Sequence, residues 1–81
     1  MVTLKNILRT EKEISCEFVP ELENQCGEMV MDRETLEVTY LYNPLGAWSA
    51  AAHTRRELRR LVNLSEEQFH QLPREINVMW Y

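Results

Sequence analysis

Two cysteines and two histidines are the residues of this 81-residue chain whose types are best suited to binding a metal ion. Cys16 and Cys26 do not form a close pair, and His53 and His70 follow much later in the chain. Structural zinc sites are built from closely spaced ligand pairs, because two neighbouring ligands in one turn fix the metal geometry. The spacing therefore predicts no metal site, and we expect no cofactor.

Nucleophilic chemistry would need Cys26 to lie beside one of the histidines, with a third group orienting the base. No glycine-rich turn or orienting carboxylate accompanies Cys26. Gly27 and Gly46 are the only glycines, which excludes a phosphate loop or a dinucleotide fingerprint. The acidic residues between positions 11 and 37 are scattered through strands and turns, as is typical of solvated edges. We expect a protein that is not an enzyme.

The stretch AAHTRRELRRLV concentrates basic charge on one segment. At helical spacing its apolar stripe centres on Leu58, and the arginines lie around the outer side. Such a stripe is typical of a solvated helix face, or of a surface that binds nucleic acid or another polyanion. The net charge of −4, the pI near 5.1 and the isolated Trp48 argue against nucleic acid. The candidate polyanion contacts are Arg55, Arg56, Arg59 and Arg60.

The elements that position these residues follow from periodicity. Alternating apolar and polar residues predict strands over about 2–8, 13–19, 27–32, 36–42 and 75–81. A helix is predicted over about 47–62 with Asn63 as a left-handed stop, and a short helix over about 66–71 with Ser65 and Gln68 as a capping box. In the turn DRET, the Asp32 carboxylate is expected to accept hydrogen bonds from backbone N–H groups further along.

This order predicts one domain, residues 1–81, of the α+β class. We expect an antiparallel sheet of about five strands with one main amphipathic helix packed on one face. The side chains predicted to face the helix are Ile14, Cys16, Phe18, Leu36, Val38, Tyr40, Ile76, Val78 and Trp80. A reversed register in the third strand would instead turn Met29 and Met31 to the other face.

One helix covers only one face, and the uncovered face is then predicted to carry Val19, Val30, Leu41, Met79 and Tyr81. A contiguous apolar patch marks an interaction site. The alternatives are that these residues are scattered, or are covered by the loop PELENQCG. We expect a protein-interaction or self-associating module, with a weak homodimer as one form. Its alternative is polyanion binding through the arginines.

No apolar signal core begins the chain, and no window approaches 18 apolar residues. We therefore expect a soluble, cytoplasmic protein that does not bind a membrane. In that compartment Cys16 and Cys26 are expected to be free thiols, although their separation also allows a disulfide.

Overall fold

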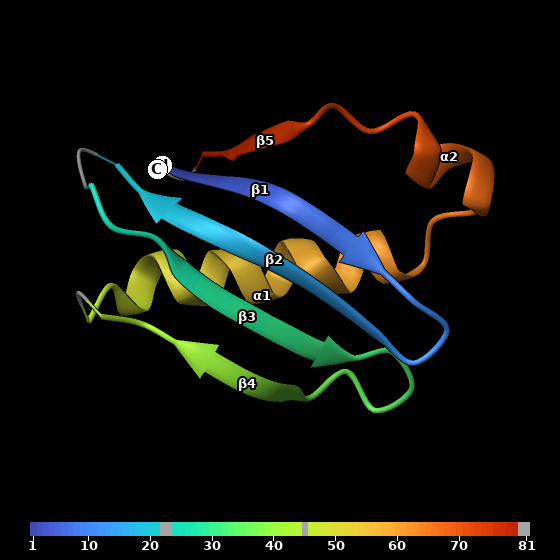
Figure 1. Ribbon diagram of the computed structural model, residues 1–81, viewed down its shortest axis with the longest axis horizontal. Coiled ribbons are helices and arrows are strands. Elements are labelled where there is room, and N and C mark those ends of the chain that lie inside the picture. The colour runs from blue at the N-terminus through green and yellow to red at the C-terminus, as the bar shows by residue number, and fades with distance from the viewer. Residues whose placement is uncertain (22–23, 45, 80–81) are drawn as a thin grey trace.

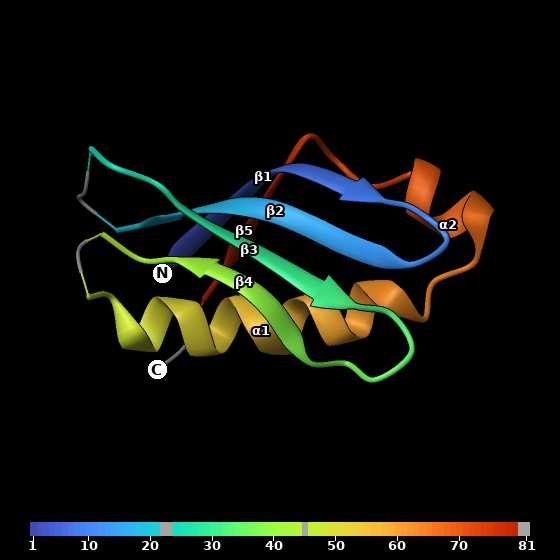
Figure 2. The same cartoon turned by 60° about the horizontal axis from the view of Figure 1, so that its bottom comes forward.

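The chain folds into two layers, an antiparallel five-stranded sheet and a helix packed across one of its faces (Figures 1 and 2). The computed structural model describes residues 1–21, 24–44 and 46–79. The strands are β1 (Val2–Arg9), β2 (Glu13–Pro20), β3 (Gly27–Asp32), β4 (Val38–Tyr42) and β5 (Glu75–Val78), and the helices are α1 (Trp48–Val62) and α2 (Glu66–His70). The sheet order is β4-β3-β2-β1-β5. The predicted fold class and element order are confirmed.

The core lies between the sheet and α1. From the sheet it takes Val2, Leu4, Ile14, Cys16, Phe18, Met29 and Met31, and from α1 it takes Ala50, Ala51, Leu58, Leu61 and Val62. Both methionines of β3 face the helix, so the reversed register does not occur. Small residues at the start of α1 let the helix lie close to the sheet. No helix in the described part of the chain is long and apolar enough to span a bilayer.

A bulge interrupts β1 and changes which side chains reach the core. The pairing with β2 shifts between Lys5 and Leu8, where two residues of β1 lie opposite one of β2. Asn6 stands in this bulge with φ +53°, a left-handed conformation that asparagine tolerates better than most residues. Beyond the bulge the alternation is reversed. Leu8 therefore lies on the uncovered face, 66% exposed, while Arg9 turns toward the helix.

A second register shift occurs where β4 pairs with β3. Val30 lies opposite Tyr40, but its neighbour Met31 lies opposite Val38, so Thr39 is an extra residue in β4. Such a bulge reverses the alternation of the strand that contains it. Val38 faces the helix as predicted, and the residues after Thr39 change sides.

This second shift makes the predicted facing of β4 wrong. Tyr40 and Tyr42 lie on the uncovered face, 51% and 49% exposed, rather than toward the helix. Leu41 lies opposite the buried Met29 and therefore on the helix side of this edge strand. A single extra residue is sufficient to reverse the facing of the residues after it, because side chains alternate with a period of two. Trp80 and Tyr81, whose facing was also predicted, lie outside the described residues.

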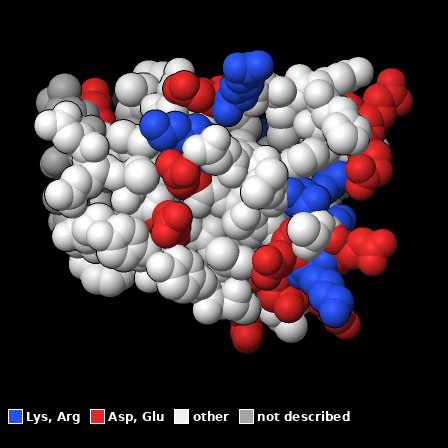
Figure 3. All heavy atoms as spheres, in the orientation of Figure 1, with Lys and Arg blue, Asp and Glu red and all other residues white. Residues whose placement is uncertain are grey.

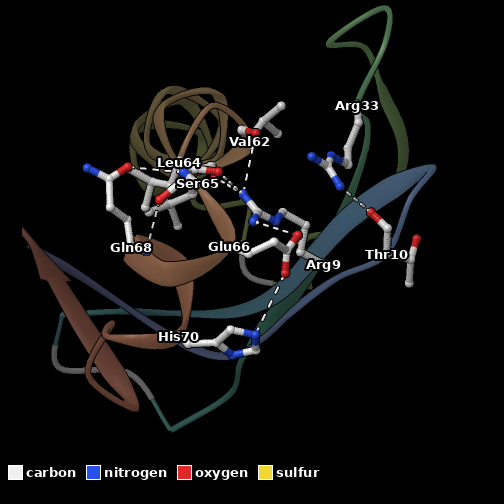
Figure 4. A network of polar contacts seen from close by, with 10 residues as sticks. Arg9, Thr10, Arg33, Val62, Leu64, Ser65, Glu66, Gln68 and His70 are labelled. Atoms are coloured by element: carbon white, nitrogen blue, oxygen red, sulfur yellow. Dashed lines mark hydrogen bonds and ion pairs between the residues drawn. The ribbon is translucent and has the colours of Figure 1, made fainter.

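Arg9 ties the end of β1 to the end of α1 (Figure 4). Its side chain is only 2% exposed. One guanidinium nitrogen donates to the carbonyl oxygens of Leu61 and Leu64, at 3.0 and 2.7 Å. The other lies 3.2 Å from the Glu66 carboxylate, and the guanidinium stands 4.3 Å above the centre of the Phe69 ring. The last carbonyls of a helix lack helical donors. Arg9 donates to one of them, that of Leu61, and to the carbonyl of Leu64 just beyond the helix.

This contact is one of several at the end of α1. Asn63 was predicted to stop the helix in the left-handed region, but its φ and ψ are −89° and −2°, which is right-handed. That prediction is wrong. The last carbonyls of α1 accept from the N–H groups of Asn63 and Leu64 and from the Asn63 side chain, and a distant arginine adds a further donor.

Two other local predictions are confirmed. Ser65 and Gln68 form the capping box of α2, each side chain accepting a hydrogen bond from the other's backbone N–H. The Asp32 carboxylate accepts from the N–H groups of Glu34 and Thr35, at 2.8 and 2.9 Å. These donors favour the ionised form and lower the pKa of Asp32.

Candidate interaction surfaces

The face of the sheet opposite α1, called here the open face, is organised in rows of side chains that run across the strands. One row is mainly apolar. Leu8 of β1 lies opposite Ser15 of β2, which is followed across β3 and β4 by Val30 and Tyr40. Both bulges contribute to this row, because Leu8 and Tyr40 would face the helix without them. Two separate irregularities in the sheet thus bring apolar side chains to the same strip of surface.

The neighbouring row is charged. From β5 to β3 it runs through Glu75, Lys5, Glu17 and Glu28, and it ends at Tyr42 of β4. Figure 3 looks onto the open face and shows acidic side chains standing among uncharged ones over the middle strands. Three carboxylates and one ammonium group give this row a net negative charge.

Glu17 and Glu28 are direct partners across β2 and β3. Like charges in this position are unfavourable, so the pair lowers the stability of the sheet. Glu17 accepts a hydrogen bond from Asn6 Nδ2 at 2.8 Å, and the Cys26 thiol donates to its second oxygen at 3.5 Å. Within the described residues Glu28 has no such donor and is exposed to solvent.

A hollow of about 250 Å³ opens between the two rows. Leu8, Val30 and Tyr40 line its apolar side, and Glu17 and Glu28 line its acidic side. The sequence pointed to Val30 alone among these residues. The available signal was Asn6, which breaks the alternation of β1 and tolerates the left-handed conformation that a bulge requires.

The five predicted contact residues do not form one patch. Val19 and Val30 lie on the open face as predicted, but the charged row separates them. Leu41 is on the helix side of the edge strand β4, and Met79 is exposed just beyond β5 at the opposite edge. Tyr81 lies outside the described residues.

Three of the four predicted arginines lie together, and the fourth has a different partner. Arg55, Arg56 and Arg59 are exposed around a second hollow of about 320 Å³ beside Ala52. Among the described residues, none of the three has a carboxylate within ion-pair distance. Arg60 is held apart, because its guanidinium bonds to Glu57 one turn earlier. The arginine hollow lies in the helical layer and the acidic hollow on the far side of the sheet.

The cysteines and histidines do not converge. Cys16 is buried beneath α1, while Cys26 donates to Glu17 on the open face, so the sheet separates two free thiols. Burial raises the pKa of Cys16 to about 12. Partial burial, followed by the hydrogen bond to Glu17, also raises the pKa of Cys26. A raised pKa lowers the thiolate fraction, which is the reverse of what a nucleophilic cysteine needs.

The His70 imidazole lies 3.7 Å from the Glu66 carboxylate and meets the Phe69 ring edge to face. Nowhere in residues 1–21, 24–44 and 46–79 do three His, Cys, Asp or Glu side chains gather closely enough to hold a metal ion. Comparisons of the chain with protein families, curated proteins and solved structures found no match.

Proposed function

We propose that this protein is a non-enzymatic interaction module whose open face binds a basic segment of a partner protein. The observation that carries the proposal is the hollow between the two rows. Its apolar side can hold the aliphatic stem of a lysine or arginine, and its acidic side can bind the cationic head. Tyr40 adds an aromatic surface beside that position.

Charge favours this partner over a second open face. Two copies packed face to face would place the carboxylates of Glu17 and Glu28 against their own counterparts, which costs free energy. A basic partner relieves the repulsion that already exists between Glu17 and Glu28. The pair destabilises the free protein, and this cost is recovered when a cation lies between the two carboxylates.

The test is a titration of the protein with a short peptide of alternating arginine and leucine, followed by amide chemical shifts in NMR. We expect the largest shifts at Glu17, Glu28, Val30 and Tyr40. The variant Glu17→Gln/Glu28→Gln should bind the peptide about tenfold more weakly, a loss of about 1.4 kcal/mol. Glutamine keeps the acceptor for Asn6, so the bulge should survive the change.

The matched control is Glu11→Gln/Glu34→Gln, which removes the same charge from two exposed turns. This control should bind as tightly as the wild type. Equal weakening by both double variants, or equal binding of a peptide of alternating glutamate and leucine, would refute the proposed site.

A further inference from the structure

The protein itself carries a basic surface that matches its acidic one. Arg55, Arg56 and Arg59 surround a hollow on the exposed side of α1, and the described structure gives them no carboxylate partner. The chain contains 13 acidic residues and 9 Lys or Arg residues, so these three arginines are unpaired despite an excess of acids. The acidic pair Glu17 and Glu28 lies in the other layer, in a row with three carboxylates and the single ammonium group of Lys5.

From this juxtaposition we infer that the partner of the open face is the α1 arginine surface of a second copy. The inference rests on the proposed role of the open face. In this assembly, α1 of one molecule lies across the open face of the next, so each sheet is covered by helices on both sides. Such three-layer packing is a common way to cover both faces of a sheet.

The spacing of the charges fits this arrangement. Arg55 and Arg59 are one helical turn apart, about 6 Å along the axis. The Cα atoms of residues paired across adjacent strands are about 5 Å apart. Glu17 and Glu28 are such a pair across β2 and β3. The arginine stems can cover the apolar row while the guanidinium groups reach the carboxylates. Ala52, small and exposed, leaves room for a side chain from the sheet.

The contact is heterologous, because it joins two different surfaces. An open assembly of such copies therefore has a free acidic face at one end and a free basic face at the other. A heterologous contact gives open chains unless the rotation between copies closes a ring. The expected species are thus a concentration-dependent series and not a dimer alone.

The test uses light scattering at low salt on two variants and their mixture. One variant is Arg55→Gln/Arg56→Gln/Arg59→Gln, which lacks the basic surface, and the other is Glu17→Gln/Glu28→Gln, which lacks the acidic one. Each variant alone should be monomeric, because one of the two surfaces is missing. An equimolar mixture should form a 1:1 dimer and nothing larger, because one intact surface remains on each molecule. The control Glu11→Gln/Glu34→Gln should assemble like the wild type.

Three results would overturn the inference. These are a wild type that is monomeric at every concentration, variants that associate as the wild type does, or a mixture that stays monomeric. Circular dichroism establishes that each variant is folded. Peptide binding by the open face is measured separately, so a monomeric wild type that binds the arginine–leucine peptide would refute self-assembly and retain the proposed function.

Discussion

At the scale of single residues, Arg9 does more for the fold than its place at the end of a strand indicates. It combines charge-assisted hydrogen bonds to helix carbonyls, an ion pair and a contact with an aromatic ring, all with its side chain almost fully buried. No sequence pattern predicts this, because the partners are more than 50 residues away. The Leu61 carbonyl also accepts from the Leu64 N–H, so Arg9 is its second donor.

We expect Arg9→Met to lower the free energy of unfolding by about 3 kcal/mol. Methionine replaces the aliphatic stem but removes the arginine donors of the Leu61 and Leu64 carbonyls, and the loss of such charge-assisted hydrogen bonds costs about 1–3 kcal/mol each. Urea unfolding measures the change. Arg9→Lys should recover only part of the lost stability. The ammonium group lacks the planar fork with which the guanidinium donates to two carbonyls and a carboxylate at once. Glu66→Gln, at an exposed partner, should cost less than about 1 kcal/mol, and a loss equal to that of Arg9→Met would contradict this account.

At the scale of the elements, the sequence was sufficient for the order and type of the strands and helices and failed at the two bulges. Alternation predicted β2 correctly because Ile14, Cys16 and Phe18 continue without interruption. In β1 and β4 the pattern is broken by one extra residue, and apolar residues occur on both sides of the break. Periodicity alone then cannot decide which set faces the helix, because either assignment buries a similar number of apolar side chains.

The candidate surface was only partly predictable for the same reason. The arginines of α1 were found from sequence, since a regular helix places residues at known angles. Leu8 and Tyr40 were missed, since each lies beyond a bulge. The pairing of Glu17 with Glu28 depends on the register between β2 and β3, which the sequence did not specify.

The β1 bulge should depend on the left-handed conformation of Asn6. We expect Asn6→Ala to lower the free energy of unfolding by about 1–2 kcal/mol, because alanine tolerates the left-handed conformation less well than asparagine and the hydrogen bond to Glu17 is lost. Asn6→Gly should cost less, because glycine adopts positive φ freely. Both variants lose the hydrogen bond to Glu17, so the difference between them isolates the backbone. Thermal and urea unfolding of both variants measure this difference. Equal stability of Asn6→Ala and Asn6→Gly would contradict the reasoning.

At the scale of the whole molecule, the distribution of charge matters more than its total. A net charge of −4 makes two copies repel at long range, yet an exposed basic surface on α1 and an acidic row on the open face allow attraction in one orientation. Salt screens the long-range repulsion and the close ion pairs at different ionic strengths, because the charges are separated by different distances. Screening of the long-range repulsion occurs first, and the loss of close ion pairs follows at higher ionic strength.

Once the long-range repulsion is screened, we expect the assembly to weaken as sodium chloride rises further. At about 1 M salt the Debye length is about 3 Å, so exposed arginine–carboxylate contacts retain little attraction. The mean mass from light scattering should fall to the 9.7 kDa monomer. Association driven by the exposed apolar side chains alone would respond in the opposite direction, since excluded salts such as sulfate strengthen apolar burial. A mass that rises in sodium sulfate and does not fall in sodium chloride would show that Leu8, Tyr40 and Tyr42 dominate the contact, and that the arginines of α1 are its solvated exterior.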